Sequence, residues 1–414
     1  FSNLDNISFE KASLSLSQLD TRFENLNKIQ KVFLNCYFNL SQTEEVFEDL
    51  ISEQKTDFSR YNYFYALFLK EKGKKRKASK IINDSVKLYP RNLLLNQYKI
   101  DLPNFSNKSN FNCKKKEHIV AEILYITANA LSSQSAYALS NFYLNLAKFL
   151  NKNFYAFDTL LAENFYKTND LSNAKITYAK LGDNGSVFKW FSKKQISRIL
   201  IEEEKKDESV KLIMKAFKDL PTKGIYETFD YAEFLKNNEK FNDSIIYYND
   251  ILEKINEKHP LYPEATDGRG VAFERIGEWD KAEKDLLASL KVNPQQAYVI
   301  NYLAYSWIEK GVKIEKSLKM LEKANKLKSG DPYIIDSLGW ALFKLKRFKE
   351  SKKYLQQALR LLPADPIVND HYGDVLWKNG KEIQARYYWR YVLGLEKADE
   401  ELKAKIEKKL IMGL

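Results

Sequence analysis

The sequence predicts an all-α protein, a right-handed solenoid in which antiparallel helix pairs stack side by side into a superhelix. Three observations predict this class. Apolar residues recur at helical spacing along most of the 414 residues. Similar segments recur at a nearly constant interval, and turn and stop residues recur with them. A unit of this kind buries its apolar side only by stacking against its neighbours.

A small residue in the second helix of each predicted pair marks the period. Its spacings are 35, 35, 38, 35, 34 and 34 along the series Ala174, Ser209, Ser244, Ala282, Ser317, Ser351 and Ala385. Ala78 and Ala138 are predicted earlier members, with an interruption between them. A small side chain here lets the two helices of a pair approach closely.

Turn and stop residues recur at the same interval. The residues expected in the left-handed turn between paired helices are Gly73, Asn169, Gly277, Gly311 and Gly380. The residues expected just past second helices are Pro90, Pro221, Pro294 and Pro363. Over the repeat span 61–395 the period predicts about ten helix pairs.

The repeats suggest four segments. Residues 1–101 are read as degenerate N-terminal helical repeats and 118–396 as the main array. Residues 102–117, with one proline, four asparagines and two serines, are read as an inserted loop. Residues 397–414 form a charged amphipathic helix that is expected to cap the array. A partner-binding tail is the alternative for this last segment.

Composition argues against several classes of function. No phosphate-binding loop, dinucleotide fingerprint or nucleophile elbow occurs, so no enzyme and no cofactor are indicated. The scattered His118, His259 and His371 do not have metal-ligand spacing. Cys36 and Cys113 do not indicate a disulfide scaffold or a zinc site. No apolar run approaches the ~18 residues of a membrane-spanning helix.

The net charge is +12, from 67 basic and 55 acidic residues, and lysine supplies most of the excess. The dense basic runs, Lys70–Lys80 and Lys114–Lys116, are interpreted as exposed turns. Neither run carries the stacking pattern of an RNA-binding module, so a nucleic-acid partner is not indicated. RNA binding through the lysine surplus stays an alternative hypothesis.

Two segments carry a family resemblance. "ERIGEWDKAEKDLLASLKVNP" (Glu274–Pro294) and "WALFKLKRFKESKKYLQQALRLLP" (Trp340–Pro363) resemble the tetratricopeptide repeat (TPR). The resemblance extends over most of the chain. It implies a non-catalytic protein-binding scaffold or adaptor. The alternative is the targeting half of an enzyme whose catalytic domain lies elsewhere.

A finer resemblance lies in the C-terminal third. Segments Asn301–Gly311, Tyr333–Leu345 and Asn369–Trp389 are similar to the closing repeats of TPR lipoproteins in the Gram-negative envelope. Some of those proteins resemble adaptors that deliver substrates to a periplasmic carboxy-terminal processing protease. The resemblance implies a periplasmic or outer-membrane-associated scaffold, partnered by a protease or its substrates. Membrane contact would come only through an upstream lipid anchor, and a cytoplasmic location is the alternative.

The concave groove of such an array is lined by its first helices. The predicted contacts are Tyr298, Asn301, Tyr305, Ile308, Tyr333, Asp336, Trp340, Phe343, Asp370, Asp374 and Trp377, with Ile367 on the same stripe. Aromatic residues would anchor a partner protein or peptide, and the carboxylates would select basic or hydrogen-bonding groups. Core packing of the aromatic residues, and ion pairs or helix capping by the carboxylates, are the alternatives. The carboxylates disfavour capture of a partner's C-terminal carboxylate.

Overall fold

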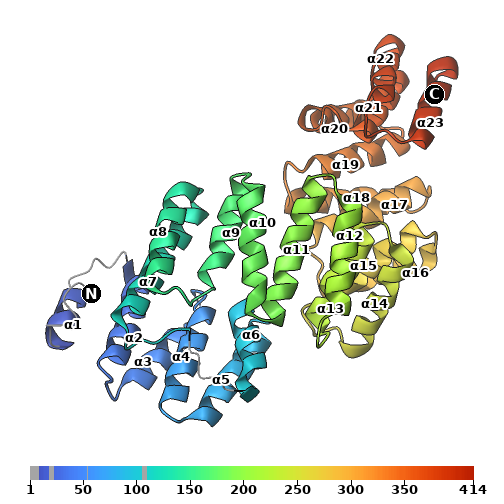
Figure 1. Ribbon diagram of the computed structural model, residues 1–414. Coiled ribbons are helices and arrows are strands. Elements are labelled where there is room, and N and C mark those ends of the chain that lie inside the picture. The colour runs from blue at the N-terminus through green and yellow to red at the C-terminus, as the bar shows by residue number, and fades with distance from the viewer. Residues whose placement is uncertain (1–8, 18–22, 54, 105–109) are drawn as a thin grey trace. The chain divides into compact units, whose positions relative to one another are not determined.

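The computed structural model describes residues 9–17, 23–53, 55–104 and 110–414. Parts of the predicted segments 1–101 and 102–117 lie outside these residues. Within the described ranges the chain forms 23 α-helices and two short 3₁₀ helices, and no strand (Figure 1). The predicted all-α class is confirmed. Two compact units divide the chain, residues 1–227 and residues 228–414.

Unit 1 holds the first twelve α-helices. They are α1 (Phe9–Ser17), α2 (Glu24–Tyr37), α3 (Thr43–Ser52), α4 (Ser59–Glu71), α5 (Lys75–Leu88), α6 (Leu93–Asp101), α7 (Lys116–Ser133), α8 (Tyr137–Leu150), α9 (Phe157–Lys167), α10 (Leu171–Leu181), α11 (Ser186–Glu202) and α12 (Lys206–Lys218). The 3₁₀ helices are η2 (Leu102–Asn104) and η3 (Gly182–Asn184).

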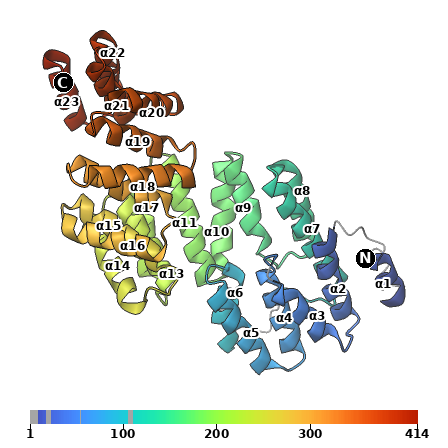
Figure 2. The ribbon, with the colours of Figure 1, turned by 180° about the vertical axis from the view of Figure 1, so that it is seen from behind.

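Unit 2 holds the remaining helices, the first of which begins in the last residues of unit 1. They are α13 (Ile225–Asn237), α14 (Phe241–Lys254), α15 (Tyr262–Arg275), α16 (Trp279–Val292), α17 (Ala297–Glu309), α18 (Ile314–Leu327), α19 (Pro332–Lys344), α20 (Phe348–Leu361), α21 (Pro366–Lys378), α22 (Glu382–Leu393) and α23 (Glu400–Met412). Figure 2 shows these helices from behind.

Nine helix pairs fall in the predicted repeat span among the described residues, from α4/α5 to α21/α22. The tenth predicted unit is not complete in the described residues, because α6 is followed by η2 and residues 110–115 form no second helix. Instead α6 packs against α11, and the backbone N–H of Val187 donates to Gln97 at 3.1 Å. The insertion therefore interrupts the pairing of helices inside unit 1.

The turns between paired helices are left-handed, as the sequence predicts. Gly73, Asn169, Gly277, Gly311 and Gly380 have φ between +60° and +83°. The same place in other pairs is taken by residues without glycine's freedom, namely Ser135, Glu204, Glu239 and Lys346, with φ between +60° and +63°. The left-handed turn thus recurs even at positions without the glycine or asparagine that would predict it from the sequence.

The small residue of the second helices is buried, with one correction to the predicted series. Ala138 is exposed, and the buried member in α8 is Ser140, 34 residues before Ala174. The hydroxyl of Ser140 donates to the carbonyl of Ala128 in the paired helix at 2.8 Å. Ser351 makes the equivalent bond to Gly339 at 2.7 Å. These serines therefore tie the two helices of a pair together as well as letting them approach.

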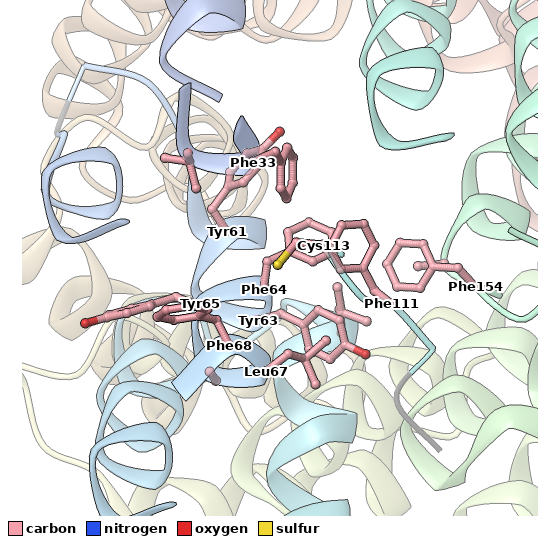
Figure 3. Close-up of a cluster of buried hydrophobic side chains, with 14 of the residues drawn as sticks. Phe33, Tyr61, Tyr63, Phe64, Tyr65, Leu67, Phe68, Phe111, Cys113 and Phe154 are labelled. Carbon is pink, nitrogen blue, oxygen red and sulfur yellow. The ribbon is translucent and has the colours of Figure 1, made fainter. Parts of the chain in front are cut away.

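Aromatic side chains form the core of unit 1 (Figure 3). Phe111 lies in the described C-terminal part of the predicted loop, is 3% exposed, and packs on Phe64 with ring centroids 4.3 Å apart. Phe33 and Phe154 also contact this ring. The end of the predicted loop is therefore anchored in the core.

A disulfide bond joins Cys36 in α2 to Cys113 at the end of the same segment, with Cα atoms 5.9 Å apart. Sequence analysis did not indicate this bond, because the two cysteines are 77 residues apart and have no motif spacing. The fold brings them together by packing Phe111 and Cys113 beside α2 and α4.

A buried ion pair lies between α4 and α7. The guanidinium of Arg60 makes two bonds to Glu122, at 2.7 and 2.9 Å, and the Glu122 side chain has no exposed surface. Arg60 also lies over the ring of Tyr125 at 4.1 Å. Paired charges with full hydrogen bonding are the form in which ions are tolerated in a core.

An aspartate N-cap recurs at the start of three helices near the end of unit 2, α19, α21 and α23. Asp331, Asp365 and Asp399 precede α19, α21 and α23 at intervals of 34 residues, and each side chain accepts a backbone N–H of the first turn. The terminal helix α23 is therefore in register with the first helices. Its Leu402 and Ile406 are buried. Glu407 occupies the repeat position at which α19 and α21 have glycine, Gly339 and Gly373, and at which those helices closely contact their second helices.

Candidate functional site

The predicted contact residues lie on three consecutive first helices of unit 2: α17, α19 and α21. Their N-terminal ends carry an exposed row that we call the apolar ridge, formed by Tyr298, Tyr333 and Ile367. The three side chains are 53%, 55% and 42% exposed. They occupy equivalent places in successive repeats, 35 and 34 residues apart. The structure thus presents one apolar side chain per repeat to solvent.

The other predicted residues lie deeper. Asn301, Tyr305, Phe343 and Trp377 are partly buried. Asp336, Trp340, Asp370 and Asp374 are buried. Ile308 has no exposed surface and packs in the core with Leu338 and Ala341, so it is not available to a partner. Of the predicted stripe, only the apolar ridge is exposed, and within it the Lys328 ammonium lies over the Tyr298 ring at 4.0 Å while the Tyr298 hydroxyl donates to Asp331 at 3.0 Å.

Asp336 and Trp340 form a buried cluster with His371, a residue that sequence analysis did not select. Nδ1 of His371 lies 2.8 Å from Oδ2 of Asp336. The imidazole stacks on the indole of Trp340, with ring centroids 3.9 Å apart and planes 12° apart. Burial alone would lower the pKa of His371, but the neighbouring Asp336 carboxylate raises it above its ordinary value. Folding therefore increases the fraction of His371 in the imidazolium form relative to the unfolded chain at the same pH.

Trp340 connects this cluster to the preceding repeat. Its indole N–H donates to Glu309 at the end of α17 at 2.6 Å. Its other neighbours are Phe343, whose ring lies parallel to the indole, and the Lys344 ammonium, 4.7 Å from the ring centroid. Burial and the carboxylates of Glu309 and Asp336 raise the pKa of Tyr305 nearby.

Two buried acceptors in this region have no donor among the residues that the structure describes. They are Oδ1 of Asp336 and Oδ1 of Asn301. Buried acceptors normally have a partner, because an unmade hydrogen bond costs about 1–3 kcal/mol. Both acceptors are buried on first helices, one turn after the ridge residues Tyr298 and Tyr333.

The other two predicted carboxylates are paired within the chain. The ammonium of Lys409, in α23, lies 2.6 Å from Oδ1 of Asp370 and 2.8 Å from Oδ1 of Asp374. The indole N–H of Trp389 also donates to Asp374, at 3.0 Å. Burial, together with the like charge of Asp370, raises the pKa of Asp374 to about 6 despite Lys409. The ion pairs weighed as an alternative are what the structure contains here.

The residues that complete this region, His371, Glu309 and Lys409, lacked a usable sequence signal. His371 follows a predicted contact by one position, where helical geometry turns it toward the preceding helix. Lys409 stands one period after the buried Val375, so the repeat pattern marks its place as buried without naming a partner.

Two further properties bear on function. Among the described residues, no group of three or more histidine, cysteine, aspartate or glutamate side chains could hold a metal ion. In the same part of the chain, no helix combines the length and apolar character needed to cross a membrane.

The fold and the repeated inter-helix contacts define a helical-repeat protein. A family model described as "Tetratricopeptide repeat" matches residues 177–398, more than half of the chain. The chain belongs to the tetratricopeptide repeat family.

The chain is also similar to several known proteins. The chain is 28% identical over 178 residues to the TPR repeat-containing protein PA4667 of Pseudomonas aeruginosa. The aligned segment covers 42% of this chain and 29% of that protein. The match thus spans less than a third of the relative's length. Solved structures with similarity include MamA from Desulfovibrio magneticus RS-1 (15% identity, 42% of this chain, 97% of that chain, TM-score 0.36) and PilF of Pseudomonas aeruginosa (20%, 45%, 85%, 0.37).

Proposed function

We propose that the chain is a non-catalytic scaffold or adaptor that binds a partner protein, or an extended segment of one, along the first helices of unit 2. The apolar ridge carries this proposal. Tyrosine and isoleucine side chains exposed at the repeat interval offer one anchor per repeat, and aromatic anchors remove much area from water at small entropic cost.

The proposed contact depends on the exposed ridge residues and not on the acceptors beneath them. Oδ1 of Asp336 and Oδ1 of Asn301 have no donor among the described residues, but both atoms are buried and are therefore shielded from a docked partner. Asp370 and Asp374 are engaged by Lys409 and are therefore left out of the proposed contact surface.

We place this scaffold in a Gram-negative cell envelope, with a carboxy-terminal processing protease or its substrates as the proposed partner. The similarity of the last three repeats to envelope TPR lipoproteins supports the location. The Cys36–Cys113 disulfide supports it independently, because disulfides persist in oxidising compartments such as the periplasm. We further propose that α23 closes the array. At the position where Gly339 and Gly373 allow close packing of a second helix, α23 has the charged side chain of Glu407, which would prevent such packing.

A photo-crosslinking amino acid at position 333 tests the contact surface. The matched control is the same group at position 387, because Tyr387 is 66% exposed on α22, a second helix. We expect one protein to be crosslinked from position 333 in envelope extract and not from position 387, and Tyr298→Ala to reduce that product. Equal products from both positions, or none from position 333, would contradict the proposal.

A further inference from the structure

The second helix α8 presents an apolar face to solvent that nothing in unit 1 covers among the described residues. Leu139, Phe142, Leu146 and Phe149 are 48%, 57%, 38% and 71% exposed. The helix packs against α7 and α9 through its other side, where Ser140, Leu144 and Ala147 are buried (Figure 1). Four large apolar side chains on one face of a 14-residue helix form an exposed patch that calls for a partner.

The surroundings of this face are almost free of charge. From residue 123 to residue 157 the sequence contains no aspartate or glutamate, and its charged residues are Lys148 and Lys152. The chain as a whole is 29% charged. Lys148 pairs with Asp158, and the Lys152 ammonium lies over the Phe149 ring at 5.9 Å. Depletion of charge combined with aromatic residues is the composition of an interface core.

The spacing of the four residues favours a helix as the occupant. They follow one another at steps of three, four and three, which is the a/d seam along which two helices pack knobs into holes. A lipid surface would instead favour a broader apolar face flanked by basic residues.

The same four residues are complementary to themselves. When two copies of α8 run antiparallel about a two-fold axis at residue 144, Leu139 faces Phe149 of the second copy and Phe142 faces its Leu146. Each smaller side chain then meets a larger one, and both pairs repeat by symmetry. On a chain with net charge +12, this neutral face is also where copies approach without lysine repulsion.

We infer that α8 is a self-association surface through which two copies of the chain form an antiparallel, two-fold dimer. Four side chains bury less than the roughly 800 Å² per partner of a standard stable interface. The dimer is therefore weak and depends on concentration. Such pairing would double the number of partner sites per assembly, whichever partner the first helices bind.

Sedimentation equilibrium of the full chain tests this inference. We expect the average mass to rise with concentration from the 48.5 kDa of the monomer toward twice that value. Phe142→Glu should hold the chain at the monomer mass. Ile246→Glu is the matched control, because Ile246 is 62% exposed on α14 in unit 2, and it should leave the dimer intact. Circular dichroism should show equal helix content in all three proteins.

A mixture of two variants tests the orientation. Phe142→Glu and Leu146→Lys should each be monomeric alone, and together they should form a heterodimer, because antiparallel pairing brings residue 142 opposite residue 146. A wild-type chain that stays monomeric at all concentrations would overturn the self-association, including one that binds anionic lipid vesicles instead. Equal loss of the dimer in Ile246→Glu would overturn the assignment to α8, and a mixture that stays monomeric would overturn the antiparallel pairing.

Discussion

Lys409 in α23 places its ammonium 2.8 Å from Oδ1 of Asp374 in α21. The same ammonium reaches Asp370, so one lysine pairs with two carboxylates on the inner side of the last complete repeat. The residues after α23 also contact α21: Gly413 lies against the indole of Trp377, and Lys378 donates to the carbonyl of Leu414 at 3.0 Å. Figures 1 and 2 show α23 beside α22 at the end of unit 2. Lys409 therefore holds α23 to α21 by charge, in addition to the packing of the buried Leu402 and Ile406 of α23.

Lys409→Met tests this relationship. It leaves Asp370 and Asp374 buried without a cation, and loss of one partner of a buried ion pair costs about 3–5 kcal/mol. We expect α23 to lose protection in hydrogen exchange and the unfolding midpoint to fall. Lys408→Met is the control, because Lys408 is exposed on the same helix. Equal protection of α23 in both variants would show that apolar packing alone holds the helix.

The repeat pattern predicted much of the fold because period, turns and stops are local signals. It located Gly73 and Gly380 in left-handed turns and placed Tyr298 and Tyr333 on one row. It could not tell Ser140 from Ala138, since both are small and the two lie only two positions apart. Choosing between them required knowing which face of α8 meets α7.

The chemistry of the site was harder to predict, because it depends on pairs between elements. Asp336 was correctly placed on a first helix, but its burial depends on His371, 35 residues later. Asp370 and Asp374 depend on Lys409, which lies beyond the last complete repeat. The Cys36–Cys113 bond likewise results from packing of Phe111. A single sequence gives the residue types at these positions, but it does not show which of the side chains contact one another in the fold.

Stability of unit 2 should fall as pH rises, because Asp374, His371 and Asp267 all bind protons more tightly in the folded chain, and the pKa of Asp267 is likewise raised to about 6 by burial. The pKa of Asp374 is raised from 3.8 to about 6, so its contribution is complete below about pH 4 and is lost as pH rises to about 6. A shift of this size corresponds to on the order of 3 kcal/mol. The pKa of His371 is raised above 6.5, so its contribution is present below pH 6.5 and is lost at higher pH.

Denaturant unfolding across this pH range checks the prediction. Asp374→Asn should flatten the lower part of the profile and His371→Gln the upper part. Asp280→Asn, at an exposed position of α16, should leave the profile unchanged. A profile that rises with pH, or one that Asp374→Asn does not alter, would contradict the assignment.

Lys346→Gly should stabilise the chain. Lys346 has φ of +60°, a conformation that costs an ordinary residue about 1–2 kcal/mol. Glycine removes that cost but gains freedom when unfolded, worth roughly 0.5–1 kcal/mol, so the net gain should lie between zero and about 1.5 kcal/mol. Gly380→Ala makes the opposite change one repeat later, at φ +74° with no atom near the new methyl group, and should destabilise by about 1 kcal/mol. Thermal unfolding of both variants measures the difference, and a lower melting temperature for Lys346→Gly would be inconsistent with strain at this turn.

Cys36→Ser should weaken unit 1 specifically. The disulfide closes a separation of 77 residues and joins α2 to the segment that carries Phe111 into the aromatic core. Removing a native disulfide of this kind costs about 2–5 kcal/mol, mainly by freeing the unfolded chain. We expect hydrogen exchange to quicken in α2, in α4 and around Phe111, with little change in α19 and α21. A reducing agent should lower the stability of the wild-type chain and leave Cys36→Ser unaffected. If the reducing agent changes neither protein, or destabilises both equally, the bond does not support the packing of Phe111 against Phe64.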